Sequence, residues 1–522
     1  MTQNLKLYEE NFYNTNNMTI PEINQLRKSG NVEDAYRECK ALLNQSPDDR
    51  GTRICMAWCL KSLSEIVSKN KECDRFIDLL KELANLQLEE VGENSMANRF
   101  AWDLHVLFDS MKFEPEKLVG IADRIVEILP KLCFLKPNKY YSMLADSFLK
   151  VKGRQGAVWL RFYDFMNWFG FDNFSDEDYK KIQIKDGKSI ISLVERVYSA
   201  YYKVLNALFI SGAVDDEKIK NHLDKLDELN EKHPEYQYTL YHKALLLLMI
   251  DKKEDAIQAI RPFVKKKRND FWVWDVLGDA IDDDELKLSC YCRALSCKAE
   301  PKFLGKVRIK TAKVMHTLGF DGNARTEIRL LHKVYEENGW NTPKEALEIK
   351  KQQWYQAATA SDSNLDFYKS HLGESEEFLF IDTPEMPILI TRVNKEKHIC
   401  NFVDSERNRG FFSTKKLKGK FFENNVILAR VEKENDCKIS RLLTWRKVDN
   451  LLPYEGVFFK TIDGYIKIKE GKNFGFVGDI FVDESLLKDN VVAGEYVSVK
   501  AVITYNQKKD SWGWRAIALR TT

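Results

Sequence analysis

The 522-residue sequence has no long apolar run and few cysteines, and each shortage excludes a class of protein. The longest apolar run, from Ala244 to Ile250, is far too short to span a bilayer. The first residues are polar and of mixed charge, without the apolar segment of a secretory signal. Ten cysteines without regular spacing make no disulfide framework. We therefore expect a cytoplasmic protein with reduced thiols and no membrane contact.

Sequence motifs for metal binding and for catalysis are also missing. The most closely spaced cysteines, Cys290, Cys292 and Cys297, lack a second CxxC or a His pair, so we expect no metal site. The eight histidines form no H-E-x-x-H, and no G-x-S-x-G occurs. We expect no cofactor, and we predict that the chain is not an enzyme. An unrecognised active site in the aromatic stretch 157–174 is the alternative, although such stretches are usually core.

Helical periodicity dominates residues 20–374, behind a polar tail at 1–19. Gly30 is followed by Ala35 after five residues, and Pro47 comes twelve residues later. Trp274, Leu277 and Gly278 form a W-x2-L-G segment. These spacings resemble the tetratricopeptide repeat, whose unit is two antiparallel helices in 34 residues. The resemblance implies a solenoid with a groove for a protein partner. Between about 90 and 235 the repeat phase is unclear, and a non-repeating helical bundle is the alternative.

One basic segment lies inside the helical region. Lys265, Lys266, Lys267 and Arg268 fall at the C-terminal end of an expected helix. Cations at that position are favourable to the helix dipole, which is a purely structural explanation. A phosphate-binding patch is the functional alternative.

Beyond residue 377 the periodicity changes from helical to alternating. Two blocks, 378–447 and 453–522, each contain five candidate strands and predict a small OB-type barrel. In the second block, "NFGFVGDIFVDESLL" resembles the cold-shock domain, which binds single strands by stacking bases on aromatic rings. The resemblance implies stacking roles for Phe474, Phe476 and Phe481, with Lys472 beside them. Asp483 stands where the family has a stacking histidine.

The first block is more basic than the rest of a nearly neutral chain. The whole sequence has 81 Lys and Arg against 79 Asp and Glu, so any nucleic-acid binding must be local. Residues 391–447 contain 15 Lys and Arg against 7 Asp and Glu. We expect phosphate attraction in this block and base stacking in the next. The candidate residues of the first block are Arg409, Phe411, Phe412, Lys415, Lys416 and Lys418.

Together these features predict a multidomain fold, α then β: a helical repeat solenoid followed by two OB-type barrels. The predicted function is a non-catalytic scaffold that binds single-stranded nucleic acid, RNA before DNA, and docks a protein partner on its helices. This layout resembles components of bacterial antiviral conflict systems, where such proteins accompany separate enzymes. The competing hypothesis is an adaptor whose barrels bind protein instead of nucleic acid.

Overall fold

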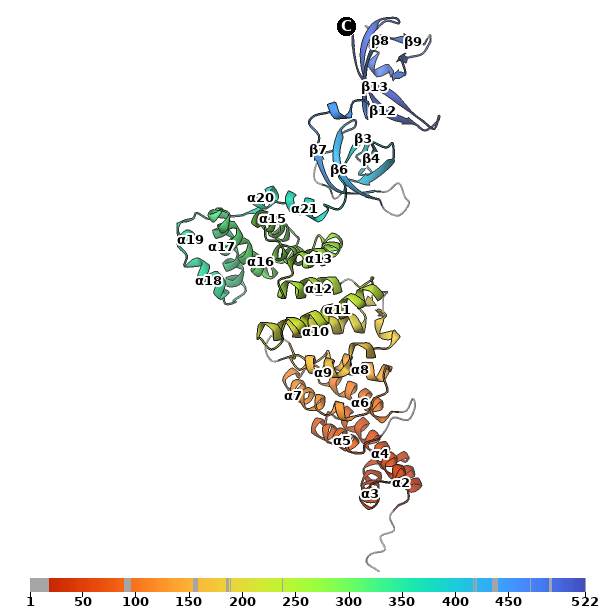
Figure 1. Cartoon of the computed structure of the whole chain (residues 1–522), viewed down its shortest axis with the longest axis vertical. Helices are drawn as coiled ribbons and strands as arrows, with labels where there is room; N and C mark the ends of the chain where they lie inside the picture. Colours follow the sequence, from red (N-terminus) through yellow and green to blue (C-terminus); the bar gives the residue numbers. More distant parts are fainter. Residues whose placement is uncertain are drawn as a thin grey trace, which may run out of the picture. The chain divides into compact units, whose positions relative to one another are not determined.

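In the computed structural model, the chain is helical up to Leu379 and strand-rich from Met386 onward (Figure 1). The predicted order, helices followed by β-barrels, is thus confirmed. The structure describes residues 18–521 except 89–94, 154–157, 185–186, 188, 237, 416, 418–419, 434–439, 470 and 488–490. The chain forms two compact units, Met1–Arg268 with Asp279–Ile281, and Asn269–Gly278 with Asp282–Thr522. No helix of the described ranges is both long and apolar enough to cross a membrane.

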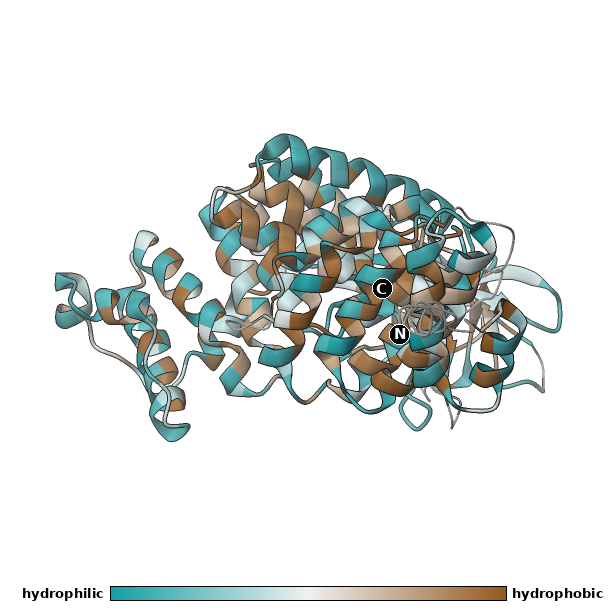
Figure 2. Ribbon diagram, turned by 90° about the horizontal axis from the view of Figure 1, so that it is seen from below, coloured by the Kyte–Doolittle hydropathy of each residue, from teal (hydrophilic) through white to brown (hydrophobic). Residues whose placement is uncertain are grey.

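The first unit is an array in which each helix packs on its near neighbours in sequence, such as α3 on α4 and α4 on α6. Hydrophobic residues lie on one side of the helices and hydrophilic residues on the other (Figure 2). This unit holds the short hairpin of β1 (Ile182–Gln183) and β2 (Ser189–Ile190) and the helices α2 (Ile20–Lys28), α3 (Val32–Gln45), α4 (Arg50–Lys69), α5 (Cys73–Asn85), α6 (Met96–Ser110), α7 (Pro115–Val126), α8 (Lys139–Phe148), α9 (Phe162–Phe169), α10 (Leu193–Ile210), α11 (Asp216–Lys232), α12 (Tyr238–Met249) and α13 (Lys253–Lys267).

The first helix pair shows how the sequence sets these boundaries. Thr19 and Glu22 form a capping box at the start of α2. Gly30 has a φ of +97°, in the left-handed region that glycine adopts without strain, and it separates α2 from α3. Ala35 and Cys39 are fully buried on α3. Small side chains at these two positions let the neighbouring helices approach closely.

Most aromatic residues of the described stretch 158–174 are core, as predicted. Phe162, Phe165 and Phe169 on α9 are buried, and Trp159 is buried before it. The rings of Phe148 and Trp159 stack with their centroids 5.1 Å apart. Packing against other rings accounts for these aromatics without a ligand.

The helices of the second unit continue to Leu379, five residues beyond the predicted end of the array. They are α14 (Phe271–Ala280), α15 (Asp284–Leu295), α16 (Gly305–Thr317), α17 (Asp321–Glu337), α18 (Lys344–Lys350), α19 (Gln353–Ala357), α20 (Leu365–Ser370) and α21 (Gly373–Leu379). A Cβ on Gly278 would lie 2.5 Å from the Tyr291 ring, so this glycine permits close contact between α14 and α15. The Ser375 backbone N–H donates to Ser289 Oγ at 2.9 Å and ties α21 to α15. The tetratricopeptide character of these pairs stays a prediction.

Two small barrels follow the helices. The first has the strand order β5-β4-β3-β6-β7, and its edge strands β5 and β7 lie in contact. The second has the order β8-β12-β13-β11-β10-β9, in which β11 and β13 pair in parallel. The strands are β3 (Met386–Asn394), β4 (Ile399–Asp404), β5 (Arg409–Ser413), β6 (Val426–Lys433), β7 (Ser440–Lys447), β8 (Phe459–Tyr465), β9 (Lys467–Ile468), β10 (Gly475–Val477), β11 (Ile480–Val482), β12 (Tyr496–Asn506) and β13 (Ser511–Thr521).

The two barrels each have a core and also share a third hydrophobic cluster. The first barrel contributes Leu389, Val403 and Val426 to the shared cluster. The second contributes a set of buried residues from β8, β12 and the segment before β8: Phe458, Phe459, Val502 and Ile503. Burial of this apolar surface holds the barrels together, so they form a tandem pair.

Candidate nucleic-acid interface

The hairpin of β10 and β11 turns alternate side chains to opposite faces of the second barrel. Val477, Ile480 and Val482 are buried in the barrel core. Phe476 and Phe481 lie directly opposite each other across the two strands. Because their sequence neighbours fill the core, these two rings point outward.

Three phenylalanine rings cluster on this outer face. The ring centroid of Phe474 lies 6.0 Å from that of Phe476 and 5.5 Å from that of Phe481, and the last two lie 5.7 Å apart. Phe476 is 39% exposed, and the other two are half-buried. The aromatic motif therefore forms an exterior platform, the geometry that base stacking requires.

Gly475 separates the first two rings and faces inward. A Cβ at this position would lie 3.0 Å from the backbone oxygen of Lys467 and 3.4 Å from the Ile466 side chain. The glycine thus lets β9 and β10 pack closely. Close packing here keeps the neighbouring rings fixed on one strand.

Cations flank the three rings in a row that runs across four strands. Lys467 on β9 is paired with Phe476, and Arg515 on β13 is paired with Phe481. Both cations are exposed. Directly paired residues on one face of a sheet are close neighbours. Sequence analysis missed Lys467 and Arg515, because only the strand register shows that they share a face with the rings.

The other polar residues expected near the platform differ in charge. Lys472 is exposed in the turn before β10, and its backbone N–H donates to the carbonyl of Lys469 at 3.0 Å. Asp483 ends β11, where the hydrogen bond from the Ser485 backbone N–H lowers the pKa of its carboxyl, as does Arg515 nearby. A carboxylate at this edge of the platform repels a phosphate. The phosphate backbone of a bound nucleic acid is therefore expected to lie on the side of the platform where Lys467 and Lys472 are.

The first barrel corrects one predicted stacking residue. Phe412 is 1% exposed and packs in the core against Phe402 and Phe421. On β5 the inward positions are Gly410 and Phe412, because side chains alternate along a strand. A buried ring cannot stack on a base, so Phe412 is a core residue.

Phe411 points outward from the same strand and lines a shallow hollow of about 230 Å³. The strand register brings Arg392, Asn401 and Phe411 into one row across β3, β4 and β5. The hollow is lined by Phe411 together with Arg392, Asn394, Lys397, Ile399 and Asn401. Two cations and two amides beside one aromatic ring suit contacts to phosphate and to a base edge. The sequence prediction did not include Arg392, Lys397 and Asn401, because they precede the basic, aromatic segment 409–418 on which it was based.

Arg409 contacts the second barrel. Its guanidinium lies 3.5 Å from the ring centroid of Tyr505, and that of Arg407 lies 5.7 Å from the ring of Trp512. Cation–π contacts of this kind stabilise the junction between the barrels. The contact with Tyr505 gives Arg409 a structural role. Its role in nucleic-acid binding stays a prediction.

The predicted lysines of the first barrel are only partly described. Lys415 is exposed just after β5, and its backbone N–H lies 3.4 Å from Ser413 Oγ. Lys416 and Lys418 lie outside the described residues. Their role as phosphate contacts stays a prediction.

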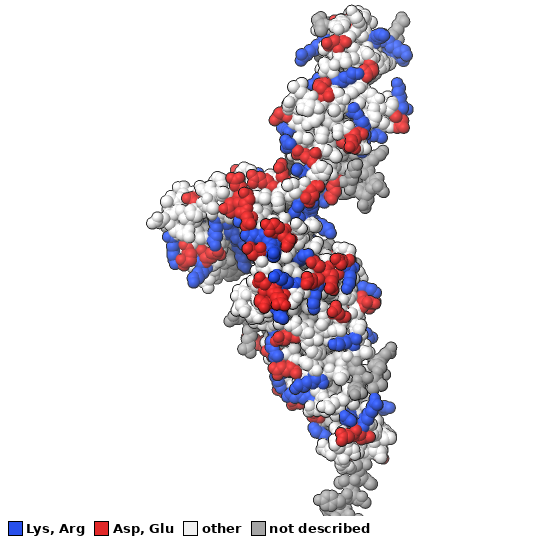
Figure 3. Space-filling model, in the orientation of Figure 1, with Lys and Arg blue, Asp and Glu red and all other residues white. Residues whose placement is uncertain are grey.

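The basic segment of the helical region occupies the predicted position. Lys265, Lys266 and Lys267 form the last turn of α13, and Arg268 is its C-cap residue. Both signs of charge are interspersed over the visible face of the helices in Figure 3. Favourable interaction with the helix dipole explains the segment. The alternative of a phosphate patch stays a prediction.

Three buried thiols are the residues best placed to hold a metal ion. The sulfur atoms of Cys39, Cys55 and Cys59 all lie within 4.8 Å of one another. Among the described residues, no His, Asp or Glu joins them as a fourth ligand. Tetrahedral zinc uses four ligands, so the set fits a structural zinc site poorly. Packing of α3 against α4 by small apolar thiols accounts for the cluster.

Comparison with known protein families places two parts of the chain. Residues 460–519 match the S1/CSD-like domain 2 of the TOTE conflict systems. Residues 237–374 match a domain of unknown function, DUF7017. No curated protein matches the chain. The second barrel is thus similar to an S1/CSD-like domain, as the cold-shock resemblance predicted. The DUF7017 match covers part of the helical region that precedes both barrels.

Proposed function

We propose that this protein is a non-catalytic scaffold that binds single-stranded nucleic acid through its barrels and a protein partner through its helices. The observation that carries the proposal is the exterior cluster of Phe474, Phe476 and Phe481 between Lys467 and Arg515. Exposed rings stack on bases of any sequence, and flanking cations attract the phosphates. The match to a domain of conflict systems supports a role in bacterial antiviral defence.

The first barrel adds a second contact region in this proposal. Arg392, Lys397 and Phe411 line its hollow, and the shared cluster fixes this barrel to the next. A single-stranded nucleic acid that lies along both barrels would gain phosphate contacts on the first barrel and base stacking on the second. We also propose a preference for RNA over DNA, which is tested by comparing the affinities for the two kinds of strand.

The test is a binding titration of the full chain with labelled 12-nucleotide strands. Oligo-U, oligo-dT and the matching duplexes are compared by fluorescence anisotropy at several salt concentrations. We expect single strands to bind more tightly than duplexes, U₁₂ more tightly than dT₁₂, and affinity to fall as salt rises. Absence of single-strand binding would favour the protein-binding adaptor. A pull-down from lysate with and without nuclease separates direct partners from those joined by nucleic acid.

A further inference from the structure

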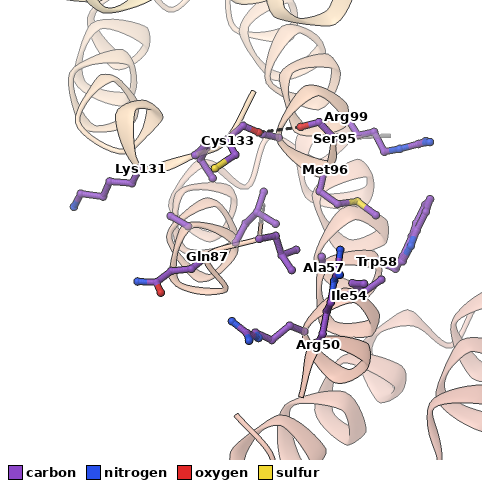
Figure 4. Close-up of a pocket in the computed structure, with 16 residues that line it drawn as sticks. Arg50, Ile54, Ala57, Trp58, Gln87, Ser95, Met96, Arg99, Lys131 and Cys133 are labelled. Atoms are coloured by element: carbon purple, nitrogen blue, oxygen red, sulfur yellow. Dashed lines mark hydrogen bonds between the residues drawn. The ribbon is translucent and has the colours of Figure 1, made fainter. Parts of the chain in front are cut away.

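The first unit contains a pocket of about 700 Å³ in a part of the helical array that neither family match covers. It lies between α4, α5, α6 and the segment 131–133 (Figure 4). Its volume is in the range typical of small-molecule sites. Much of the wall is apolar and comes from Ile54, Ala57, Trp58, Met96 and Leu132.

The described residues that line the pocket carry charge of one sign. Arg50, Arg53, Arg99 and Lys131 line it, and none of its 16 lining residues is Asp or Glu. The whole chain has nearly equal numbers of cations and anions, so a local excess of four is a departure from its average. Several cations that line a hollow with apolar walls raise the local potential and attract an anion. Residues 89–94, which join α5 to α6 and include three glutamates, lie outside the described residues.

The four cations come from three elements, α4, α6 and the segment 131–133, and are held in different ways. Arg50 and Arg53 lie three residues apart on α4, where side chains share a face. Arg53 Nη2 donates to the Asp48 backbone oxygen at 3.0 Å. Arg99 on α6 lies over the Trp58 ring, 5.0 Å from its centroid. Arg50 and Lys131 are exposed, and no carboxylate of the described residues forms an ion pair with either of them.

The arginines and the apolar walls together indicate which class of ligand would fit the pocket. A guanidinium forms paired hydrogen bonds with phosphate oxygens, and several cations together suit a ligand with more than one phosphate. Ile54, Met96 and the Trp58 edge offer apolar surface for a flat ring. The Ser95 hydroxyl already donates to the Cys133 backbone oxygen at 2.9 Å, which leaves Gln87 as the lining amide for a base edge.

We propose that this pocket binds a nucleoside di- or triphosphate, with its phosphates on Arg50, Arg53 and Lys131 and its base against the apolar wall. This site is independent of the strand-binding face of the barrels. It would make the helical array responsive to a nucleotide. No bond is made or broken in this binding.

The test is calorimetric titration of the full chain with ATP, GTP, ADP, AMP and tripolyphosphate. We expect ATP or GTP to bind more tightly than AMP and more tightly than tripolyphosphate. The double variant Arg50→Gln/Lys131→Gln is expected to weaken nucleotide binding at least tenfold. Both side chains are exposed, so the variant is expected to fold, which the thermal unfolding midpoint checks. The matched control, Lys152→Gln/Lys218→Gln, removes two exposed cations elsewhere in the same unit and is expected to bind as the parent does.

Three results would overturn the proposal. One is that no nucleotide binds, or that the double variant binds nucleotide as the parent does. Another is that tripolyphosphate binds as tightly as ATP, since the base would then lie outside the pocket. The third is that an acidic peptide such as hexaglutamate binds in place of nucleotides, which would make the pocket a peptide site. Strand binding by the barrels is measured separately with U₁₂, so failure of either proposal is distinguishable from failure of the other.

Discussion

Both barrels bury one face of their strands in a hydrophobic core but present different outer faces. In the second barrel the outward row across the sheet consists of Lys467, Phe476, Phe481 and Arg515. In the first barrel an outward row across β3, β4 and β5 consists of Arg392, Asn401 and Phe411. One face offers several rings between two cations, and the other offers a single ring among polar groups. The outward residues, which the fold leaves free to vary, set what each barrel can bind.

The difference also extends to how each barrel uses its cations. Arg407 and Arg409 of the first barrel lie over Trp512 and Tyr505 of the second. Part of the positive charge that the sequence concentrates in the first barrel therefore lies at the junction between the barrels. The charge count of a segment thus overestimates the charge available to a ligand.

The largest expected effect comes from the two adjacent phenylalanines of β5. Phe412→Ala removes a buried ring and is expected to destabilise the first barrel by about 3–5 kcal/mol. Phe411→Ala removes an outward ring and is expected to leave stability nearly unchanged. Hydrogen exchange of the β4 and β5 amides in the full chain measures both. Equal protection in the two variants would show that the assignment of inward and outward faces on β5 is wrong.

A smaller effect is expected at Gly410, the other inward position of β5. A Cβ there would lie 2.6 Å from Cζ of the buried Phe402 ring and 3.1 Å from Ser440 Oγ. Gly410→Ala is therefore expected to destabilise the first barrel by about 1–3 kcal/mol through overpacking. Gly513→Ala in the second barrel is the control, because nothing lies within 4 Å of its Cβ position. A loss of exchange protection of similar size in both variants would remove close packing as the cause.

The smallest effect separates phosphate contacts from stacking. Arg392→Gln with Lys397→Gln removes two cations from the hollow of the first barrel. The slope of log K against log salt is about −0.7 for each phosphate contact on a single strand, so loss of the pair is expected to make the slope less negative by about 1.4. Lys152→Gln with Lys218→Gln, in the first unit, is expected to leave the slope unchanged. An unaltered slope in the first variant would exclude the hollow from the bound strand's path.

Sequence patterns predicted the architecture better than they predicted the site. Alternation predicted both barrels, although the second has six strands where five were expected. Helical spacing placed Gly30 and the buried Ala35 correctly. The aromatic motif placed Phe474, Phe476 and Phe481 together because they lie on adjacent strands.

The errors arose where a pattern does not fix register. Two adjacent phenylalanines on one strand must point to opposite faces, and the sequence alone does not say which of Phe411 and Phe412 is buried. Arg515 comes from a strand distant in sequence, and Lys467 is placed beside Phe476 only by the register of β9 against β10. The contact of Arg409 with Tyr505 depends on how two barrels pack, which no local pattern contains.

The central claim is that the phenylalanine cluster of the second barrel is a stacking surface, and Phe476→Ala tests it most directly. The full-length variant is titrated with labelled U₁₂ beside Tyr465→Ala, which removes a ring of the same barrel that is 66% exposed and lies outside the cluster. Loss of one stacking ring costs about 1–3 kcal/mol of binding. We expect Phe476→Ala to keep the parent's thermal unfolding midpoint and to bind about tenfold more weakly, while Tyr465→Ala binds as the parent does. Parental affinity in Phe476→Ala, or unfolding of its barrel, would contradict the claim.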